Sequence, residues 1–306
     1  MSSDDEEIDI IKTINEIETL IVYDVVNYLK TGIFKNKHND KYVKSYTLVY
    51  KASNSSNESD YGFSLNKYYK DTIENYCEFA KNKLMSIVPE SDLSQNVLFF
   101  ETFLVEFNKC LILVHWLQKI FNSLDKFYIP DNKLSFLFDQ GMKLINKSLF
   151  SPLKKIIFKS ICDLINYHRD GINIDLNLVM NVIELFTKIE MENVKIVKMN
   201  EFYDIQGGVT KKYVFSEWFE NHFKISSNEY FSKKSEEFIS RYSPYEYVQE
   251  CIKLFNEENQ RIKHFLDPSF SSKIYDMFNN NFIDNNSLAL TEVRFFLRSI
   301  QKELGL

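Results

Sequence analysis

Glycine and proline are scarce in this sequence, which has only seven glycines and five prolines among 306 residues. Average glycine usage is about 7%, so an ordinary fold of this length carries roughly two to three times as many glycines. Turns with positive φ and strand bulges depend on glycine, which makes a β-sandwich or a β-barrel a poor fit. The scarcity favours long helices joined by few connections.

Motifs that hold metals, phosphates or nucleophiles are also missing. The sequence has no CxxC, HExxH, GxSxG or GxGxxG, and GGVTKK at 207–212 lacks the spacing of a phosphate-binding loop. The five histidines are widely separated, and each of the four cysteines lies alone in an apolar stretch. We therefore expect no catalytic residue, no metal site and no cofactor, with the cysteines as buried thiols in a reducing compartment.

The chain also lacks an excess of basic residues and a long apolar run. Its formal net charge is −6 at pH 7, whereas nucleic-acid binding needs a basic face. The start, MSSDDEEIDI, lacks the basic-then-apolar order of a signal peptide, and CLILVHWLQKIF at 110–121 is too short and polar to span a bilayer. These features predict an intracellular protein, cytoplasmic or nuclear, with no nucleic-acid or membrane partner.

Helical periodicity is what the sequence does contain. Apolar residues recur at three- and four-residue steps from Ile10 to Leu29, which predicts a buried helical stripe that Gly32 ends. Acidic residues at 4–7 precede this helix, where they suit the positive end of its dipole. Further helices are expected at about 41–51, at 65–87 and within 93–127.

The later part of the chain shows the clearest helix boundaries. Ser243 is expected to cap a long helix, with Pro244 in its first turn and Glu246 completing a capping box. The pair at 267–268, Asp-Pro, is expected to end it. Upstream, FSEWFENHF at 215–223 carries phenylalanines at four-residue steps, so its rings are expected to pack mainly in a core, with a docking surface as the alternative. Taken together, the pattern predicts an all-α fold, an elongated α-solenoid or bundle.

Several of these segments resemble the cullin family, and they do so in the family's order over roughly residues 10–280. The residues that carry the resemblance are KYVKSYTLVY at 41–50, LDKFYI at 124–129, Leu164, Ile165, Arg169, Gly171, Ile174, Asp175, Phe215, Phe219, Glu220, Phe223, Tyr230, Phe231, Ser235, Tyr247, Glu257, Glu258, Arg261 and Leu266. The sequence looks most like the cullin that serves F-box adaptors.

The resemblance implies a non-catalytic scaffold arm of a cullin-RING ubiquitin ligase, acting in ubiquitin-dependent protein degradation. It implies an elongated α-solenoid of five-helix repeats, which we expect at 1–135, at 136–270 and, as a partial third repeat or tail, at 271–306. The first repeat is expected to bind an adaptor of BTB/POZ fold, of the F-box type, that carries a substrate receptor. A RING subunit is expected only if a carboxy-terminal domain exists beyond this sequence.

The adaptor-binding positions implied by the resemblance lie on the second and fifth helices of the first repeat. They are Tyr42, Val43, Tyr46, Tyr50, Ser123 and Phe127. The sequence favours surface positions for the first two tyrosines and leaves the third, Tyr50, undecided between core and surface. Ser123 stands where the family carries a tyrosine, so either Phe127 compensates one turn later, or the adaptor is divergent, or this half of the interface is weak.

Three other interpretations stay open at this point. The sequence is either a fragment of a longer cullin or a shortened product, and a shortened product would act as a decoy that sequesters adaptors. A helical-rod subunit of a vesicle-tethering complex would have a similar aromatic-rich, long-helix composition. An enzyme would be reconsidered only for a deep polar pocket with converging ionisable groups.

Overall fold

The computed structural model describes residues 9–33, 39–54, 58–87, 92–189, 191–192, 195–199, 202–206, 209–210, 214–265 and 271–284. The chain divides into two compact units. Unit 1 comprises Met1–Val88, Val97–Lys154 and Lys188–Lys211, and unit 2 comprises Pro89–Asn96, Lys155–Thr187 and Lys212–Leu306. These units are compact bodies and not sequence repeats, and the repeat boundaries expected at 135 and 270 remain a prediction.

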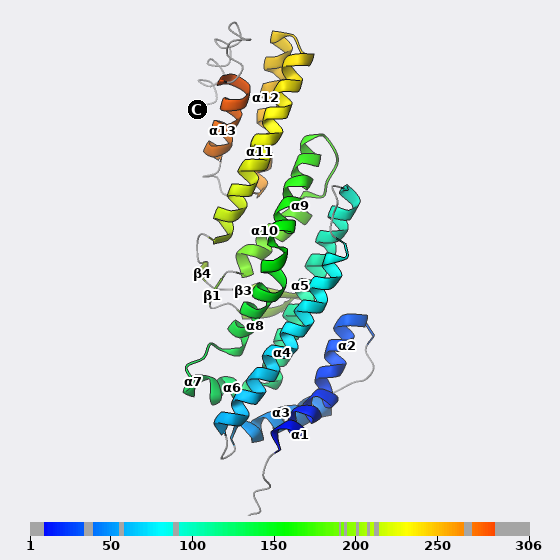
Figure 1. Ribbon diagram of the computed structural model, residues 1–306, viewed down its shortest axis with the longest axis vertical. Helices are drawn as coiled ribbons and strands as arrows, with labels where there is room; N and C mark the ends of the chain where they lie inside the picture. The colour runs from blue at the N-terminus through cyan, green and yellow to red at the C-terminus, as the bar shows by residue number, and fades with distance from the viewer. Residues whose placement is uncertain are drawn as a thin grey trace, which may run out of the picture. The chain divides into compact units, whose positions relative to one another are not determined.

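Helices dominate both units (Figure 1), which confirms the all-α fold class. The α-helices are α1 (Ile10–Ile17), α2 (Tyr23–Thr31), α3 (Asn39–Ser53), α4 (Glu58–Met85), α5 (Leu93–Ile120), α6 (Asn122–Lys126), α7 (Tyr128–Asp131), α8 (Leu137–Ile145), α9 (Ser151–Arg169), α10 (Leu176–Ile189), α11 (Val214–Arg241), α12 (Pro244–Phe265) and α13 (Ser271–Asn279). Three π-helical turns continue α1, α8 and α13, namely η1 (Glu18–Val22), η2 (Asn146–Phe150) and η4 (Asn280–Asp284).

The first predicted helix is confirmed as the continuous run α1–η1–α2. Asp9 caps its start, because the carboxylate accepts hydrogen bonds from the amides of Ile11 and Lys12 at 3.0 and 3.1 Å. Gly32 ends it in the left-handed region at φ 73°, and its amide donates to the carbonyl of Tyr28 at 2.7 Å. The acidic run at 4–7 lies outside the described residues.

The core of unit 1 includes large aromatic and aliphatic side chains of α4 and α5, which run alongside each other in Figure 1. Tyr69 is fully buried, and its hydroxyl donates to the carbonyl of Leu137 at 2.7 Å. Near the start of α4, Gly62 lies against the ring of Tyr128, and a Cβ at that position would lie 2.2 Å from a ring carbon. The absent side chain therefore permits the close approach of α4 and α7.

A buried carboxylate links α4 to α5. Glu106 is fully buried, and it accepts hydrogen bonds from Lys83 at 2.8 Å, Lys109 at 2.9 Å and the hydroxyl of Tyr76 at 3.2 Å. Burial would raise the pKa of Glu106, but the two lysines outweigh burial and lower it below its usual value. The carboxylate is therefore held ionised as a structural link.

The sequence did not predict the strands of unit 1. They are β1 (Met191–Glu192), β2 (Lys195–Met199), β3 (Phe202–Gln206) and β4 (Val209–Thr210). The central pair is antiparallel, with Lys195 opposite Gln206 and Met199 opposite Phe202, and β1 pairs with β4 outside it. The all-α prediction holds for the fold class, and this short segment is a local exception to it.

The core of unit 2 is also aromatic. Phe219 and Phe223, from the segment at 215–223, are both 2% exposed and stack at 5.8 Å, which confirms their predicted place in the core. The side chains of Phe215 and Trp218 lie outside the described residues. At the other end of the unit, Tyr247 is buried and its hydroxyl donates to the carbonyl of Phe282 in η4 at 2.7 Å.

The predicted cap of the long helix α12 is confirmed. The carboxylate of Glu246 accepts hydrogen bonds from the amide and the hydroxyl of Ser243 at 2.9 and 2.7 Å, and Pro244 is the first helical residue. The described helix ends at Phe265, so the predicted stop at 267–268 lies outside the described residues.

The cysteines are buried and unbridged, as expected. Cys77 and Cys110 place their sulfur atoms 3.9 Å apart between α4 and α5, and this hydrogen bond together with burial raises the pKa of Cys110. Within the part of the chain that the structure describes, no group of histidine, cysteine, aspartate and glutamate is arranged to hold a metal ion. None of the helices in that part is both long and apolar enough to cross a membrane.

Candidate functional site

An aromatic surface is formed in unit 1 where α3 adjoins the end of α5 and the junction between α6 and α7. We call it the aromatic ridge and define it by five residues: Tyr42, Tyr46, Tyr50, Trp116 and Phe127. The three tyrosines share one side of α3 because they lie four residues apart. Trp116 comes from the last turns of α5, and Phe127 lies between α6 and α7.

One end of the aromatic ridge is held by Trp116. The rings of Tyr42 and Trp116 meet edge to face, with centroids 6.4 Å apart and planes at 78°. The hydroxyl of Tyr42 also donates a long hydrogen bond to the carbonyl of Lys119 at 3.5 Å. This contact fixes the first tyrosine against α5 and leaves the ring half-buried.

The other end is formed by Tyr46, Tyr50 and Phe127. The first two rings stack with centroids 6.4 Å apart and planes at 20°. Tyr50 then meets Phe127 edge to face, at 6.2 Å and 68°. Because each ring packs against the next, these side chains lose little further conformational entropy when a partner covers them.

Exposure along the aromatic ridge differs in detail from the sequence prediction. Tyr50 is 46% exposed, so it belongs to the surface and not to the core. Tyr42 and Tyr46, expected at the surface, are half-buried, as is Phe127. Val43 adds an aliphatic side chain that is 59% exposed. The result is a partly open apolar surface edged by phenolic hydroxyls, a composition common in protein–protein interfaces.

Ser123 lies in the core and not on this surface. Its side chain is fully buried, and its Oγ lies 3.1 Å from the Oγ of Ser53. Ser53 donates its own hydrogen to the carbonyl of Val49 at 2.8 Å, so Ser123 is the donor between the two hydroxyls. The expectation that this position faces an adaptor is therefore corrected: Ser123 holds α6 against α3.

Two residues of this region were missed by the sequence analysis. Trp116 was treated as part of an apolar run, and Lys119 was not considered. The ammonium group of Lys119 lies 5.7 Å from the centroid of the Trp116 ring, within cation–π range. Their three-residue spacing on α5 was the available signal, but only the position of α3 makes it a surface that continues to Tyr42.

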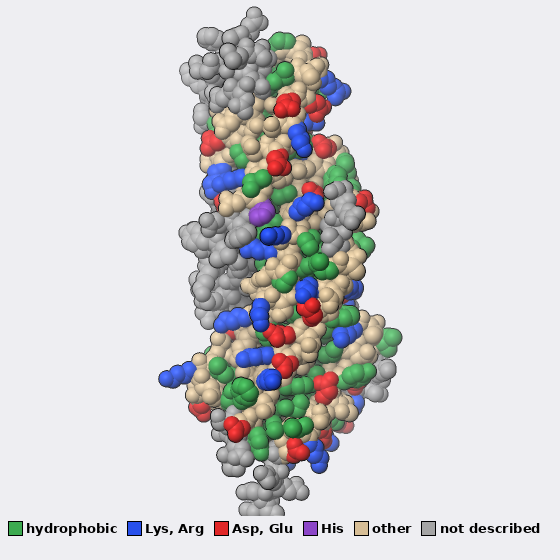
Figure 2. Space-filling view, in the orientation of Figure 1, with side chains coloured by type: hydrophobic (Ala, Val, Ile, Leu, Met, Phe, Trp, Pro, Cys, Tyr) green, Lys and Arg blue, Asp and Glu red, His purple; other side chains and the backbone are tan. Residues whose placement is uncertain are grey.

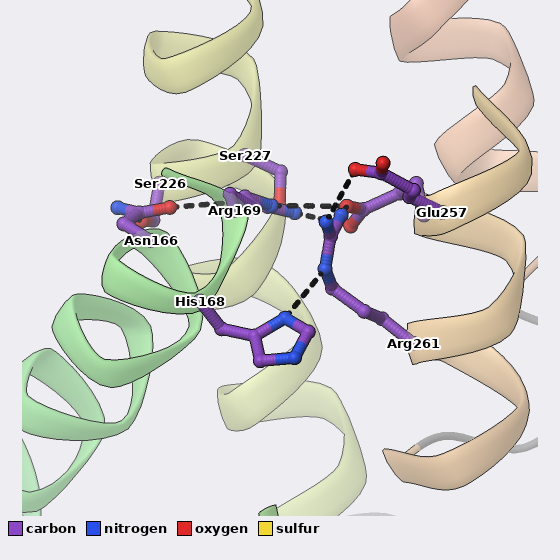
Figure 3. Close-up of polar contacts among 8 residues, drawn as sticks. Asn166, His168, Arg169, Ser226, Ser227, Glu257 and Arg261 are labelled. Carbon is purple, nitrogen blue, oxygen red and sulfur yellow. Dashed lines mark hydrogen bonds and ion pairs between the residues drawn. The ribbon is translucent and has the colours of Figure 1, made fainter. Parts of the chain in front are cut away.

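A cluster of polar and charged side chains lies in unit 2, and Figure 3 shows it between α9, α11 and α12. Arg169 and Glu258 are buried and form an ion pair, with the Nε of Arg169 donating to Glu258 at 3.0 Å. Arg261 donates to the same carboxylate at 2.6 Å and to Nδ1 of His168 at 2.9 Å. Ser227 accepts a further hydrogen bond from Arg169 at 2.8 Å. We call these residues, together with Asn166 and Glu257, the buried ion cluster.

The electrostatics of the buried ion cluster are those of a structural network. Burial would raise the pKa of Glu258, but Arg169 and Arg261 outweigh it and hold that pKa below its usual value. Burial and the charge of Arg261 lower the pKa of His168, against the opposing effect of Glu257 and Glu258. Each charged group is matched by opposite charge or by hydrogen bonds, so the cluster joins three helices.

Comparison with known protein families gives a match over most of the chain. The family described as "Cullin: Cullin alpha solenoid domain" matches residues 25–304. Cullin-3 of Dictyostelium discoideum is 24% identical over 199 residues, which are 63% of this chain and 24% of that protein.

Two proteins of another cullin type are similarly related. Cullin-1 of Oryza sativa subsp. japonica is 22% identical over 165 residues, covering 54% of this chain and 21% of that protein. Cullin-1 of Dictyostelium discoideum is 21% identical over 268 residues, covering 83% of this chain and 33% of that protein. The chain therefore spans about a third or less of the length of these curated relatives.

Proposed function

The chain belongs to the cullin family, and we propose that its aromatic ridge binds a BTB/POZ-fold adaptor of the F-box type. In this role the chain is a non-catalytic scaffold arm of a cullin-RING ubiquitin ligase and serves ubiquitin-dependent protein degradation. The adaptor carries the substrate receptor, so this chain contacts the substrate only through it. A RING subunit takes part through a carboxy-terminal domain, where one is present.

The observation that carries this proposal is the packed row of rings on α3. Tyr46, Tyr50 and Phe127 form a continuous contact, and Val43 stands beside them as an exposed aliphatic side chain. Partly exposed tyrosines that are already fixed by their neighbours are common anchors of protein interfaces. These positions also correspond to the adaptor-binding helix that the cullin resemblance implies.

The choice of an F-box-type adaptor rests on the resemblance of several segments in their order along the chain, KYVKSYTLVY among them, and not on overall identity. Relatives of two cullin types are 21 to 24% identical to this chain, a range too narrow to separate them. A competition experiment tests the choice: F-box-type and other BTB/POZ-fold adaptors are offered together to the chain. We expect the F-box-type adaptor to be retained, and retention of another BTB/POZ protein in its place refutes this part of the proposal.

The repeat organisation is proposed together with the function. A first repeat at 1–135 contains the entire aromatic ridge, a second repeat occupies 136–270, and 271–306 begins a third or forms a tail. The buried ion cluster of Arg169, Glu258 and Arg261 then lies wholly within the second repeat. A tethering-complex subunit and an enzyme, both considered from the sequence, receive no support from the family match.

The adaptor contact is tested by truncating two rings of the aromatic ridge. The double variant Tyr46→Ala/Tyr50→Ala removes two neighbouring anchors, and one interface hot spot contributes about 2 kcal/mol, or about 30-fold in Kd. We expect Kd for the F-box-type adaptor, measured by calorimetry, to rise by at least this factor. Val43→Asp introduces a charge at a residue that is 59% exposed, and it should weaken binding with little effect on folding.

Tyr245→Ala is the matched control, because this tyrosine of unit 2 is 72% exposed and lies outside the aromatic ridge. It should leave Kd unchanged. Unchanged affinity in both the double variant and Val43→Asp would show that the adaptor binds elsewhere. Thermal melting of each variant separates a lost contact from a lost fold.

A further inference from the structure

We propose that Trp116 is an anchor of the adaptor contact and that its indole N–H donates a hydrogen bond to an oxygen atom of the adaptor. The inference rests on the proposed function and deepens it by naming a residue that selects the partner and the group that this residue recognises. It moves the second side of the contact from Ser123 of α6, where the cullin resemblance implies it, to the last turns of α5.

The α6 side of the aromatic ridge lacks the anchor that the resemblance implies. Ser123 stands at that position, it is fully buried, and its hydroxyl lies 3.1 Å from that of Ser53. A fully buried serine offers a partner neither apolar area nor a free polar group. Phe127 on the same side is half-buried and packs against Tyr50 at 6.2 Å. A contact that spans two helices therefore draws its second anchor from another element.

Trp116 provides such an anchor beside α3. Its ring meets the ring of Tyr42 edge to face at 6.4 Å, and the Nζ of Lys119 lies 5.7 Å from its centroid. The hydroxyl of Tyr42 donates to the carbonyl of Lys119 at 3.5 Å, which ties α3 to the end of α5 at this point. The tryptophan is thus held in place before a partner arrives, so covering it costs little conformational entropy.

The polar edge of Trp116 has no partner of its own. Among the residues that the structure describes, nothing accepts a hydrogen bond from the indole N–H, although the ring is half-buried. A covered indole N–H normally has an acceptor, because a buried donor left unpaired costs free energy. An adaptor that covers this ring therefore binds well only if it places an oxygen atom against the N–H. An adaptor with an apolar group there is rejected, which gives the contact specificity.

A partner can reach the ring of Trp116. The side chain that lies over it is Lys119, which is exposed and flexible, so a partner can displace it. Figure 2 shows hydrophobic side chains at the surface, among charged ones, in the region where Figure 1 labels α1, α3 and α6. The contact with Tyr42 makes Trp116 continuous with the aromatic ridge, so one adaptor covers both.

Nuclear magnetic resonance of the indole N–H tests the hydrogen bond directly. The sequence has two tryptophans, Trp116 and Trp218, so the variant Trp218→Phe leaves a single indole N–H resonance. When the F-box-type adaptor is added to saturation, that resonance should move downfield and its exchange with water should slow. A bound state in which the resonance keeps both its position and its exchange rate overturns the proposal.

Affinity measurements test the anchor. Trp116→Phe keeps an aromatic ring and removes the donor, so Kd for the F-box-type adaptor should rise about fivefold, the worth of one hydrogen bond. Trp116→Ala also removes the ring, and Kd should then rise about 30-fold, as for an interface hot spot. An unchanged Kd in either variant overturns the proposal. Thermal melting of each variant shows whether the fold is retained.

Leu98→Ala is the matched control, because Leu98 is a 50% exposed apolar residue of the same helix. It lies about 27 Å from Trp116 along the axis, at about 1.5 Å per residue, and its loss should leave Kd unchanged. Equal rises of Kd in Leu98→Ala and Trp116→Ala would attribute the effect to α5 as a whole and overturn the anchor.

These outcomes are distinct from a failure of the proposed function. If Tyr46→Ala/Tyr50→Ala abolishes binding while both Trp116 variants bind as tightly as the wild type, the adaptor site stands and the tryptophan anchor is wrong. If the adaptor fails to bind the wild-type chain, both proposals fall together.

Discussion

Replacing Glu258 with glutamine should destabilise unit 2 severely, although the two side chains have nearly the same shape. The carboxylate is fully buried and accepts hydrogen bonds from Arg169 and from Arg261. Both guanidinium groups are themselves buried, with 6% and 5% of each residue exposed. The substitution therefore removes the negative charge that neutralises two cations and leaves no cavity behind.

The size of the effect follows from the distances. Arg261 approaches the carboxylate to 2.6 Å and Arg169 to 3.0 Å through its Nε. Opposite charges about 4 Å apart interact by about 4 kcal/mol at an effective dielectric constant of about 20. Removing one partner of a buried pair typically costs about 3 to 5 kcal/mol. Because a domain is stable by only about 5 to 15 kcal/mol, the loss takes a large share of the stability of unit 2.

Hydrogen exchange read by mass spectrometry is the appropriate assay, since it separates the two units. Peptides of α9 and α12 should lose protection in Glu258→Gln, while peptides of α4 in unit 1 should keep theirs. Urea denaturation then gives the accompanying shift in the unfolding midpoint.

Glu257→Gln is the control at the adjacent position. Its side chain is 44% exposed and meets Arg261 at 3.1 Å, so its loss should cost about 0 to 1 kcal/mol. A loss of less than about 1 kcal/mol in Glu258→Gln would refute the electrostatic account of the buried ion cluster. The triple variant Arg169→Met/Glu258→Leu/Arg261→Met removes all three charges that meet at this carboxylate and should recover much of the lost stability. Failure to recover would indicate that packing, and not charge, causes the loss.

Three further predictions concern packing, pH and thiol reactivity. Gly62→Ala should cost about 1 to 3 kcal/mol in urea denaturation, because the added methyl group would lie 2.2 Å from a ring carbon of Tyr128; a neutral effect would contradict this contact. His168 accepts a hydrogen bond from Arg261 and has a lowered pKa, so its contribution is present above about pH 6.5 and lost as the pH falls below it. The urea midpoint should therefore fall less steeply toward pH 5 in His168→Gln than in wild type, and parallel curves would exclude this histidine as a cause. All cysteines are buried, so a thiol reagent should label the chain only in denaturant, and rapid labelling of the native protein would contradict their burial.

Features encoded by neighbouring residues could be predicted from the sequence. The cap formed by Ser243 and Glu246 needs only four consecutive residues, and the stop at Gly32 needs only one. The inward rings of Phe219 and Phe223 follow from helical spacing alone. Local hydrogen bonds and one-dimensional periodicity determine these features, so no knowledge of the packing was required.

The candidate site depends on how each helix is rotated about its own axis when it packs, and the hydrophobic periodicity of the sequence does not determine that rotation. Tyr50 touches Phe127 across 77 positions of sequence, and Ser123 reaches Ser53 across 70. A helix with aromatic residues on several sides can present different rings to solvent according to how its neighbours dock. The exposure of Tyr50 and the burial of Ser123 are set by that docking, and so is the place of Trp116 in the aromatic ridge.

The strand segment was missed for a different reason. Its pairing of Lys195 with Gln206 and of Met199 with Phe202 joins two five-residue strands that are close neighbours in the sequence. The scarcity of glycine across the whole chain favoured helix everywhere and concealed one local exception. Composition averages over the chain, whereas a hairpin is specified by a dozen or so residues.

The shared carboxylate of Glu258 also constrains how this protein can change over generations. A lineage that lost Glu258 alone would pass through an intermediate in which two buried guanidinium groups lack their shared carboxylate, and loss of either arginine alone would take one of its two charged partners from that carboxylate. Such positions are expected to be retained or exchanged as a set, and they should covary when many descendants of one ancestor are aligned.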